Sequence, residues 1–436
     1  MTDYNKELMS FLDKSPTAFH AVANIKVRLE AEGYTELAEP AKWELSEGGK
    51  YFVVRNDSSI IAFRTPIFDF TGFMISAAHS DSPAFKVKEN PEIVENGYVK
   101  LNVEGYGGML MAPWLDRPLS VAGRIIVKNG NKYEVRLVNV DRDLLLIPNV
   151  AIHMNRDANK GQTWNAQVDM LPVLGSADEA KGSFMRIIAE SAGVSDSDII
   201  SHDLFLYVRD KGKVWGGCEE YISAPHLDDL QCVYGCLEGF LGANNSSSVP
   251  VLAVFDNEET GSLTKQGADS TLLEDVLKRI SLSCGKDEEG YYRAVLSSFM
   301  VSADNAHALH PNHPEKADPV NRSAINKGIV IKFNAAQHYT TDAVSCAVYR
   351  DLCESNDIPV QVFTNRSDSR GGSTLGNVSN AHVSLNTVDI GLAQLAMHSC
   401  YETAGAKDTK HLINAMTIFY SKTFRVDAGG SFELLD

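Results

Sequence analysis

The chain of 436 residues carries 57 acidic and 40 basic side chains, a formal net charge of -17, with 44% hydrophobic and 22% charged residues. This composition excludes a globally disordered chain, and the length predicts two or three domains with cores of their own. The negative charge excludes nucleic acid and anionic membranes as attractive partners, because both carry the same sign of charge. Taken alone, the charge also argues against an acidic substrate, although a local field can reverse that inference.

Neither a membrane anchor nor a disulfide framework is predicted. No stretch of the sequence reaches the roughly 18 to 20 apolar residues that span a bilayer, and the first residues lack the pattern of a signal peptide. We therefore expect a cytoplasmic protein. The seven cysteines are odd in number, scattered and without a C-x-x-C pair, which supports neither disulfides nor a zinc ribbon.

The chain begins with a helical pattern and continues with strands. Apolar residues at helical spacing between residues 3 and 32, interrupted at Ser15-Pro16, predict one helix, a break and a second helix. Short apolar runs at 51–54, 60–63 and 72–78 predict strands.

The segment from about residue 86 to 223 has a different, β-rich texture. Its runs at 122–127 and 132–138 flank Asn129-Gly130-Asn131, which predicts a hairpin. We interpret this segment as an insertion, residues 88–225, that interrupts a single domain formed by residues 1–87 and 226–436.

From residue 230 onward, helices and strands alternate. The strands are continuous apolar runs, which is typical of a sheet buried on both sides. The predicted fold class is therefore α/β, a mixed sheet covered by helices on both faces, and the strand at 72–78 belongs to it. The expected elements are helices at 230–243, 270–281, 339–356 and 388–404, and strands at 249–255, 298–302, 328–333 and 360–364.

Polar residues follow several of these strands. His79-Ser80-Asp81, Asp256-Asn257-Glu258-Glu259 and Asp304 each come after an apolar run, and a further run reaches Lys332. In an open α/β sheet the ligand crevice lies beyond the carboxyl ends of the strands. We therefore expect these side chains to meet at one edge of the sheet.

The residue types at this edge suit a metal centre. His79 offers an imidazole whose second nitrogen the nearby Asp81 could hold, as is common for zinc ligands. Of two adjacent carboxylates, Glu258 and Glu259, one could bind a cation while the other accepts a proton from metal-bound water. Asp228, which precedes a helix together with Asp229, repeats the acidic pattern.

Each of these signals also has a simpler interpretation. His79 with Asp81 could be a surface turn, Glu258-Glu259 a solvated acidic loop, and Asp228 a helix cap. His398 lies inside the predicted helix at 388–404, where a lone histidine is more often structural. Taken together, however, the set of His79, Asp228, Glu259, Asp304 and His398 fits a two-zinc site.

Two further patterns carry less information. His307, His310 and His313 are spaced three residues apart, but prolines at 311 and 314 prevent a helix through this run. A three-histidine metal site is therefore not expected. His307, the nearest of the three to Asp304 in the sequence, remains a candidate substrate contact. The glycine-rich segment 371–376 lacks the ending of a phosphate loop, so a substrate-backbone loop or a plain turn fits it better.

The order of the motifs along the chain resembles the aspartyl aminopeptidase family of two-zinc metallopeptidases. The resemblance covers nearly the whole chain. It rests on Ser15-Pro16-Thr17-Ala18-Phe19-His20, Ala78-His79-Ser80-Asp81-Ser82-Pro83, Leu227-Asp228-Asp229-Leu230, Asp256-Asn257-Glu258-Glu259-Thr260-Gly261, Ser302-Ala303-Asp304-Asn305-Ala306-His307 and Leu395-Ala396-Met397-His398-Ser399.

This resemblance implies roles for the site residues. His79 and Asp304 would hold one divalent metal ion, Glu259 and His398 the other, and Asp228 would bridge the two. Zinc is the expected metal, with manganese and cobalt as open alternatives. Glu258 would be the general base that activates a metal-bridging water, and Asp81 would orient His79.

The resemblance also implies an assembly and a substrate. In the family, the inserted domain mediates dimerisation and the subunits form a homododecamer, in which His153 would reach a neighbouring active site to stabilise the transition state. Lys332 matches the position that binds the acidic side chain of the substrate. The implied activity is removal of N-terminal Asp or Glu residues from peptides with free N-termini.

Two departures from the family pattern keep other functions open. Gln337-His338-Tyr339 stands where arginine is frequent, and Arg370-Gly371-Gly372 replaces a Pro-Cys-Gly turn. The same chemistry with broader or neutral specificity is therefore the first alternative, with Lys332 as a structural ion-pair partner. A non-catalytic shell or binding protein is the second.

Overall fold

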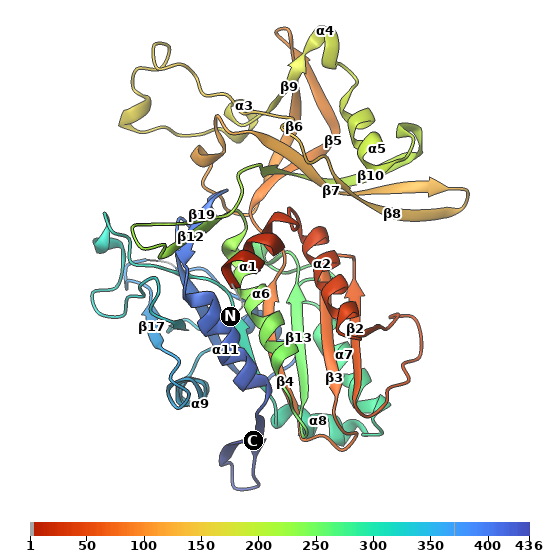
Figure 1. The fold of residues 1–436 in the computed structure, drawn as a ribbon, viewed down its shortest axis with the longest axis vertical. Helices are drawn as coiled ribbons and strands as arrows, with labels where there is room; N and C mark the ends of the chain where they lie inside the picture. Colours follow the sequence, from red (N-terminus) through yellow and green to blue (C-terminus); the bar gives the residue numbers. More distant parts are fainter. Residues whose placement is uncertain (1–3, 370) are drawn as a thin grey trace.

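The computed structural model describes residues 4–369 and 371–436 of the chain. Within these ranges, 13 strands form one mixed sheet and six strands form a second sheet. Figure 1 shows the two sheets as two lobes stacked along the long axis of the molecule, with the second sheet at the top. Among the described residues, no helix combines the length and apolarity that a bilayer crossing requires.

The large sheet collects strands from both ends of the chain. Its members are β1 (Thr35–Glu36), β2 (Gly49–Arg55), β3 (Ser59–Thr65), β4 (Phe73–His79), β11 (Lys213–Trp215), β12 (Tyr221–Ala224), β13 (Val249–Phe255), β14 (Phe299–Ala303), β15 (Ala306–His307), β16 (Ile329–Phe333), β17 (Val360–Thr364), β18 (Asn386–Leu395) and β19 (Glu402–Gly405). At its centre, β13, β4, β14 and β18 lie side by side and parallel. The predicted strands at 249–255 and 360–364 are confirmed to the residue.

Helices cover both faces of the large sheet, as predicted. One face packs against α1 (Tyr4–Asp13), α2 (Ala18–Ala31), α6 (Leu227–Gly242), α9 (Ala343–Glu354) and α11 (Asp408–Tyr420), and the other against α7 (Leu272–Ser283), α8 (Glu288–Leu296) and α10 (Leu375–Ser379). Strand β13 faces a hydrophobic core on each side of the sheet, which explains its continuously apolar sequence. Leu252 and Val254 belong to the first core, whereas Val251, Ala253 and Phe255 belong to the second.

The second sheet forms the upper lobe. It contains β5 (Ala84–Glu95), β6 (Tyr98–Tyr106), β7 (Leu119–Asn129), β8 (Lys132–Asn139), β9 (Val173–Ser176) and β10 (Ile199–Val208), with α3 (Ala166–Asp169), α4 (Ala177–Ala180) and α5 (Phe184–Ala192) beside them. The predicted hairpin is confirmed, since β7 and β8 pair as far as Asn129 and Lys132.

The limits of this lobe differ from the predicted 88–225. By sheet membership the lobe spans 84–208, because β5 already belongs to the second sheet, whereas β12 pairs with β19 of the large sheet. Which sheet a strand joins depends on pairing with residues far away in the sequence, and the local texture of a strand does not encode that partner.

The predicted helix at 388–404 is wrong. This segment forms strand β18, a turn and strand β19. Strand β18 is buried on both faces, and a short run of that kind has no periodicity that separates strand from helix. Gly391 also approaches the neighbouring chain closely, because a Cβ at this position would lie 2.0 Å from the carbonyl oxygen of Asp304.

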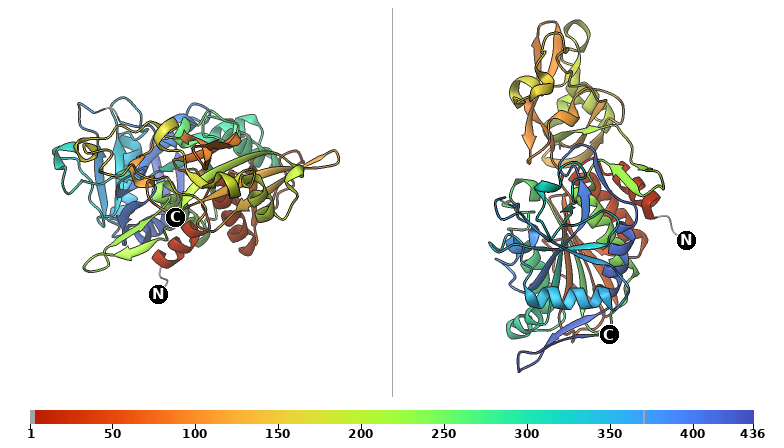
Figure 2. Two further views of the ribbon diagram at one scale, coloured as in Figure 1. Left: turned by 90° about the horizontal axis from the view of Figure 1, so that it is seen from above. Right: turned by 90° about the vertical axis from the view of Figure 1, so that its left-hand side faces the viewer.

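The C-terminal residues form a separate hairpin of β20 (Thr423–Val426) and β21 (Phe432–Leu435). It extends from the end of the molecule opposite the second sheet (Figures 1 and 2). The hairpin therefore takes no part in the contact between the two lobes.

The close packing of α6 on α11 predicts that one added methyl group lowers the stability of the folded protein. A Cβ at Gly239 would lie 2.4 Å from the Cβ of Met416, whereas a Cβ at Gly242 would lie 3.5 Å from Thr417 Oγ1. We expect Gly239→Ala to lower the free energy of unfolding by about 1–3 kcal/mol through overpacking. Gly242→Ala, the matched control, should change it by less than about 1 kcal/mol. Urea unfolding of both variants at equal protein concentration tests this, and equal stability would contradict the close approach.

Candidate metal centre and active site

The predicted strand-end residues meet at one edge of the large sheet. His79 is the last residue of β4, and Asp304 directly follows β14. Glu258 and Glu259 lie in a short 3-10 turn just after β13. Because β13, β4 and β14 are adjacent and parallel, their carboxyl ends deliver these four side chains to the same place.

Two more residues reach this place from other elements. Asp228 lies at the start of α6, where it and Asp229 have non-helical dihedral angles and are joined by a cis peptide bond. His398 lies in the turn between β18 and β19, with a positive φ of 64°. All five predicted metal ligands therefore converge, although His398 does so from a turn and not from a helix.

Asp228 stands between two groups of potential ligands. Its Oδ1 lies 3.6 Å from Nε2 of His79, and its Oδ2 lies 3.5 Å from Nε2 of His398. His79 Nε2 also lies 3.9 Å from Asp304 Oδ1, and His398 Nε2 lies 3.3 Å from Glu259 Oε2. The ligand atoms within each group lie within 4.8 Å of one another. The first group contains His79, Asp228, Asp229 and Asp304, and the second contains His398, Asp228 and Glu259. His79 forms a third group of this kind with Glu258 and Glu259.

The donor set fits divalent metal ions. Asp228 Oδ1 and Glu259 Oε1 are buried and have no hydrogen-bond partner among the described residues. Asp229 Oδ1, in the same cluster, is also buried without a partner in the described parts of the chain. Buried carboxylate oxygens are almost always paired, so three unpaired ones beside imidazoles indicate a cation-binding site. Imidazole nitrogen with carboxylate oxygen is also a combination that zinc accepts.

The electrostatics of the site lead to the same conclusion. Burial and the nearby Asp228 raise the pKa of Glu259 well above its usual range. Burial, together with Asp304 and Asp81, raises the pKa of Glu258 to about 8 against the opposing effect of His79. Divalent cations would offset this repulsion and return the carboxylates to their charged forms.

Asp81 contacts His79 and the turn that carries Glu258 and Glu259. Its Oδ1 lies 3.4 Å from Nδ1 of His79, and the same ring nitrogen is 3.1 Å from the backbone oxygen of Asp81. The two carboxylate oxygens accept hydrogen bonds from the backbone N–H groups of Glu258 and Glu259, each at 3.2 Å. These contacts outweigh burial and lower the pKa of Asp81, which keeps it anionic.

A pocket of about 270 Å³ opens in front of the cluster. Lys332 is buried in its wall, where its Nζ donates to the backbone oxygen of Asp304 at 2.8 Å and lies 3.3 Å from Asp304 Oδ2. Its charge also lies 5.2 Å from the ring centre of Tyr339. His307 lines the same pocket and packs edge-on against Phe363, so both predicted substrate-binding residues are at the site.

Other predicted positions are not part of this cluster. His153 is exposed in the segment between β8 and α3 of the second lobe. Of the segments that depart from the family pattern, Tyr339 and Gly372 line the pocket, while Arg370 lies outside the described residues.

Two residues that the sequence did not reveal support the ligands. Glu402 accepts hydrogen bonds from the backbone N–H groups of His398 at 2.8 Å and Asp228 at 2.9 Å. Tyr106 donates its hydroxyl to Asp81 Oδ2 at 2.6 Å. Burial and the Asp81 carboxylate raise the pKa of Tyr106, so its hydroxyl remains a donor. No local motif marks either residue. Asp81, the partner of Tyr106, and Asp228, one partner of Glu402, lie far away in the sequence. His398, the other partner of Glu402, lies in the segment that was wrongly predicted to be a helix.

The sequence model of the family described as Aminopeptidase I zinc metalloprotease (M18) matches residues 11–420. The chain belongs to the M18 family. It is thus a zinc metallo-aminopeptidase, which confirms the predicted enzyme class. A probable M18 family aminopeptidase 2 of Clostridium acetobutylicum is 48% identical over 427 residues, which cover 96% of this chain and 99% of the relative. One of Pseudomonas aeruginosa is 40% identical and covers 97% and 99%.

Several solved structures share the fold of this chain. Ape4 in a cryo-EM complex with Nbr1 superposes with a TM-score of 0.92 at 34% identity, over 95% of this chain and 85% of that one. The mApe1 dodecamer of S. cerevisiae gives a TM-score of 0.83 at 28% identity, over 96% of both chains. An M18 aminopeptidase of Thermotoga maritima, at 24% identity and a TM-score of 0.85, has the same fold over 96% of both chains.

Removal of one imidazole should weaken one metal subsite of this M18 protein. We expect His398→Ala to bind one zinc ion with wild-type affinity and to weaken the second by about tenfold or more, because Asp228 and Glu259 lose their nitrogen partner. His382→Ala, which breaks a 2.7 Å pair with Asp269 away from the site, is the control. Competition with a chromophoric chelator measures both variants. Wild-type binding by His398→Ala would contradict the assignment.

Proposed function

We propose that this M18 aminopeptidase removes N-terminal Asp and Glu residues from peptides with the help of two zinc ions. The observation that carries the proposal is the position of Asp228, whose two carboxylate oxygens face the imidazoles of His79 and His398. A carboxylate between two nitrogen ligands suits a bridging role. His79 and Asp304 would complete one site, and Glu259 and His398 the other.

Zinc, when bound, supplies a Lewis acid that polarises the scissile carbonyl and lowers the pKa of water. The protein supplies the proton transfers. Glu258 is half-buried and borders the pocket, and a carboxylate in this position can accept a proton and later donate it. In our proposal Glu258 takes the proton of the attacking water and delivers it to the leaving amine. Asp81 holds His79 and the turn that carries Glu258.

Lys332 supports a preference for acidic residues. It is buried in the pocket wall, and its pKa is raised because the Asp304 carboxylate outweighs the effect of burial, so it stays a cation. A substrate carboxylate would meet this charge away from bulk water, where the interaction is strong. The alternative is broader or neutral specificity, since Lys332 already pairs with Asp304.

The second lobe supports a proposal for assembly. S. cerevisiae mApe1 is a dodecamer, and its chain matches this one over 96% of its length. In this chain the second lobe exposes large apolar side chains, a common mark of an interface: Val94, Tyr98, Tyr133, Val135, Val150, Ile152 and Met154. We propose that residues of this lobe mediate dimerisation within a homododecamer, and that His153, which lies among them, acts on the active site of a neighbouring subunit.

Loss of the proposed base should stop turnover without loss of metal. We expect Glu258→Gln to lower kcat by about 10²–10⁴-fold, because the amide cannot accept the proton. Zinc content by metal analysis should stay at the wild-type value. Glu289→Gln, on the surface of α8, removes the same charge elsewhere and should leave kcat unchanged. Full activity of Glu258→Gln would favour a different base or a non-catalytic role.

Substitution of Lys332 should change the ratio of activities toward acidic and neutral substrates. We expect Lys332→Met to lower kcat/KM for Asp- and Glu-peptides by about 10–100-fold more than for Leu- and Ala-peptides, because the substrate carboxylate loses a charged partner. The ratio cancels any general loss that follows from the Asp304 contact. Lys286→Met, which breaks a surface pair with Asp69, is the control. A uniform loss across the four substrates would support the alternative of a structural Lys332.

A further inference from the structure

The segment at the end of β6 contacts both halves of the metal cluster. Tyr106 donates its hydroxyl to Asp81 Oδ2 at 2.6 Å, which is the carboxylate behind His79. The backbone oxygen of Gly108 lies 2.6 Å from Nδ1 of His398, and the backbone N–H of Leu110 donates to the oxygen of His398 at 3.0 Å. All three contacts come from the second lobe and reach Asp81 or His398, which follow strands of the large sheet.

We infer that residues 106–110 form the element through which the second lobe orients both histidine ligands, and that Tyr106 is a positioning residue for Asp81. The inference rests on the proposed metal-binding roles of His79 and His398. The ring nitrogen opposite a metal-binding nitrogen is normally held by a carboxylate or a backbone oxygen. Asp81 and Gly108 supply these two partners here, one for each histidine.

The Asp81 carboxylate connects Tyr106 with three other groups of the site. Its Oδ2 accepts the Tyr106 hydroxyl and, at 3.2 Å, the backbone N–H of Glu259, while its Oδ1 accepts the backbone N–H of Glu258 and faces His79. Of these contacts the hydroxyl bond is the shortest. Without it, the carboxylate would keep only the two longer bonds from the backbone, each at 3.2 Å, and would be held less firmly beside His79.

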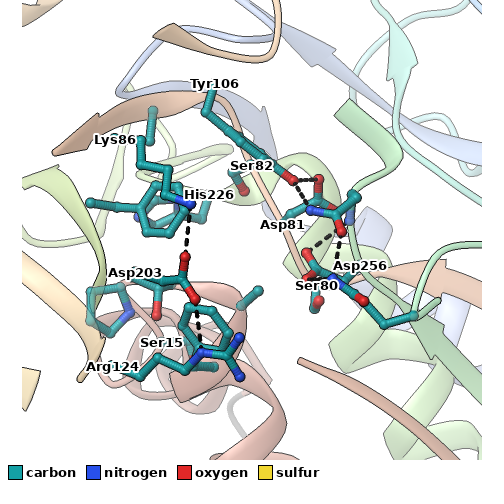
Figure 3. A pocket seen from close by; sticks show the side chains of 18 of the residues that line it. Ser15, Ser80, Asp81, Ser82, Lys86, Tyr106, Arg124, Asp203, His226 and Asp256 are labelled. Atoms are coloured by element: carbon teal, nitrogen blue, oxygen red, sulfur yellow. Dashed lines mark hydrogen bonds and ion pairs between the residues drawn. The ribbon is translucent and has the colours of Figure 1, made fainter. Parts of the chain in front are cut away.

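Tyr106 is itself held in a fixed position. Its ring packs edge-on against Phe205 with centroids 5.5 Å apart, and its hydroxyl accepts a hydrogen bond from Nδ2 of Asn257 at 2.8 Å. Tyr106 lines a cavity of about 310 Å³ between the lobes. Figure 3 shows its hydroxyl directed at Asp81. The position of the hydroxyl relative to the Asp81 carboxylate is therefore well defined. A change that spares the ring would remove only the two hydrogen bonds of the hydroxyl, the one to Asp81 and the one from Asn257.

Tyr106→Phe tests the inference against a matched control. Tyr207→Phe removes the same group from the same sheet, where the Tyr207 hydroxyl donates to Asn139 Oδ1 at 2.7 Å far from any proposed ligand. Zinc affinity of the metal-free proteins is measured by competition with a chelator. We expect Tyr106→Phe to weaken at least one zinc site by about 10–100-fold, with Tyr207→Phe within twofold of wild type. The value of kcat should fall with KM unchanged, because Tyr106 does not line the substrate pocket.

The outcomes separate this inference from the proposed function. Thermal melting of the metal-free proteins shows whether both variants fold, and a larger loss of stability in Tyr106→Phe with unchanged zinc affinity would mean a structural role and overturn the inference. Zinc affinities of the two variants that differ by less than twofold would also overturn it. If instead the wild-type protein bound no zinc, the proposed function would fail first.

Discussion

The repulsion among buried carboxylates at the strand ends is the constraint on which the rest of the site depends. Seven acidic side chains, Asp228 among them, lie together at this edge of the sheet. Burial raises the energy of the charged form of each. A folded chain tolerates such a group only when each charge has a partner. The seven residues are Asp81, Asp228, Asp229, Glu258, Glu259, Asp304 and Glu402.

The chain compensates some of these charges with its own groups and leaves others for a cation. The Asp81 carboxylate accepts hydrogen bonds from the Tyr106 hydroxyl and two backbone N–H groups. The Asp304 carboxylate pairs with Lys332, and the Glu402 carboxylate accepts from two backbone N–H groups. Asp228 and Glu259 keep buried oxygens without such partners. Asp229 Oδ1 is also buried without a partner among the described residues, and it lies in the same cluster as Asp228. A bound cation would therefore compensate the charges that the donors of the chain leave unpaired. Against the effect of burial, the contacts with His79 and Tyr106 lower the pKa of Asp81, whereas burial and Asp228 raise the pKa of Glu259 in the same cluster.

The sequence predicted the parts of this arrangement that depend on local signals. Apolar strands that end in His79, Glu258-Glu259 and Asp304 could be identified directly, because parallel strands bring their carboxyl ends together. The location of His398 could not, since a doubly buried strand looks like a helix until its neighbours are known. The supports from Glu402 and Tyr106, like the true limits of the second lobe, depend on contacts between residues far apart in the chain, and no spacing rule encodes them.

The net charge of -17 does not decide whether the substrate is acidic. A whole-chain charge describes the field far from the surface, where salt screens it within about 10 Å. Inside the pocket the nearest charges decide. Two divalent cations would add four positive charges, and Lys332 is held cationic by Asp304 in the wall. An acidic side chain that leaves water there would meet a positive local field. The carboxylate cluster thus creates the condition for an acidic substrate, because it is the concentration of negative charge that would hold the cations in place.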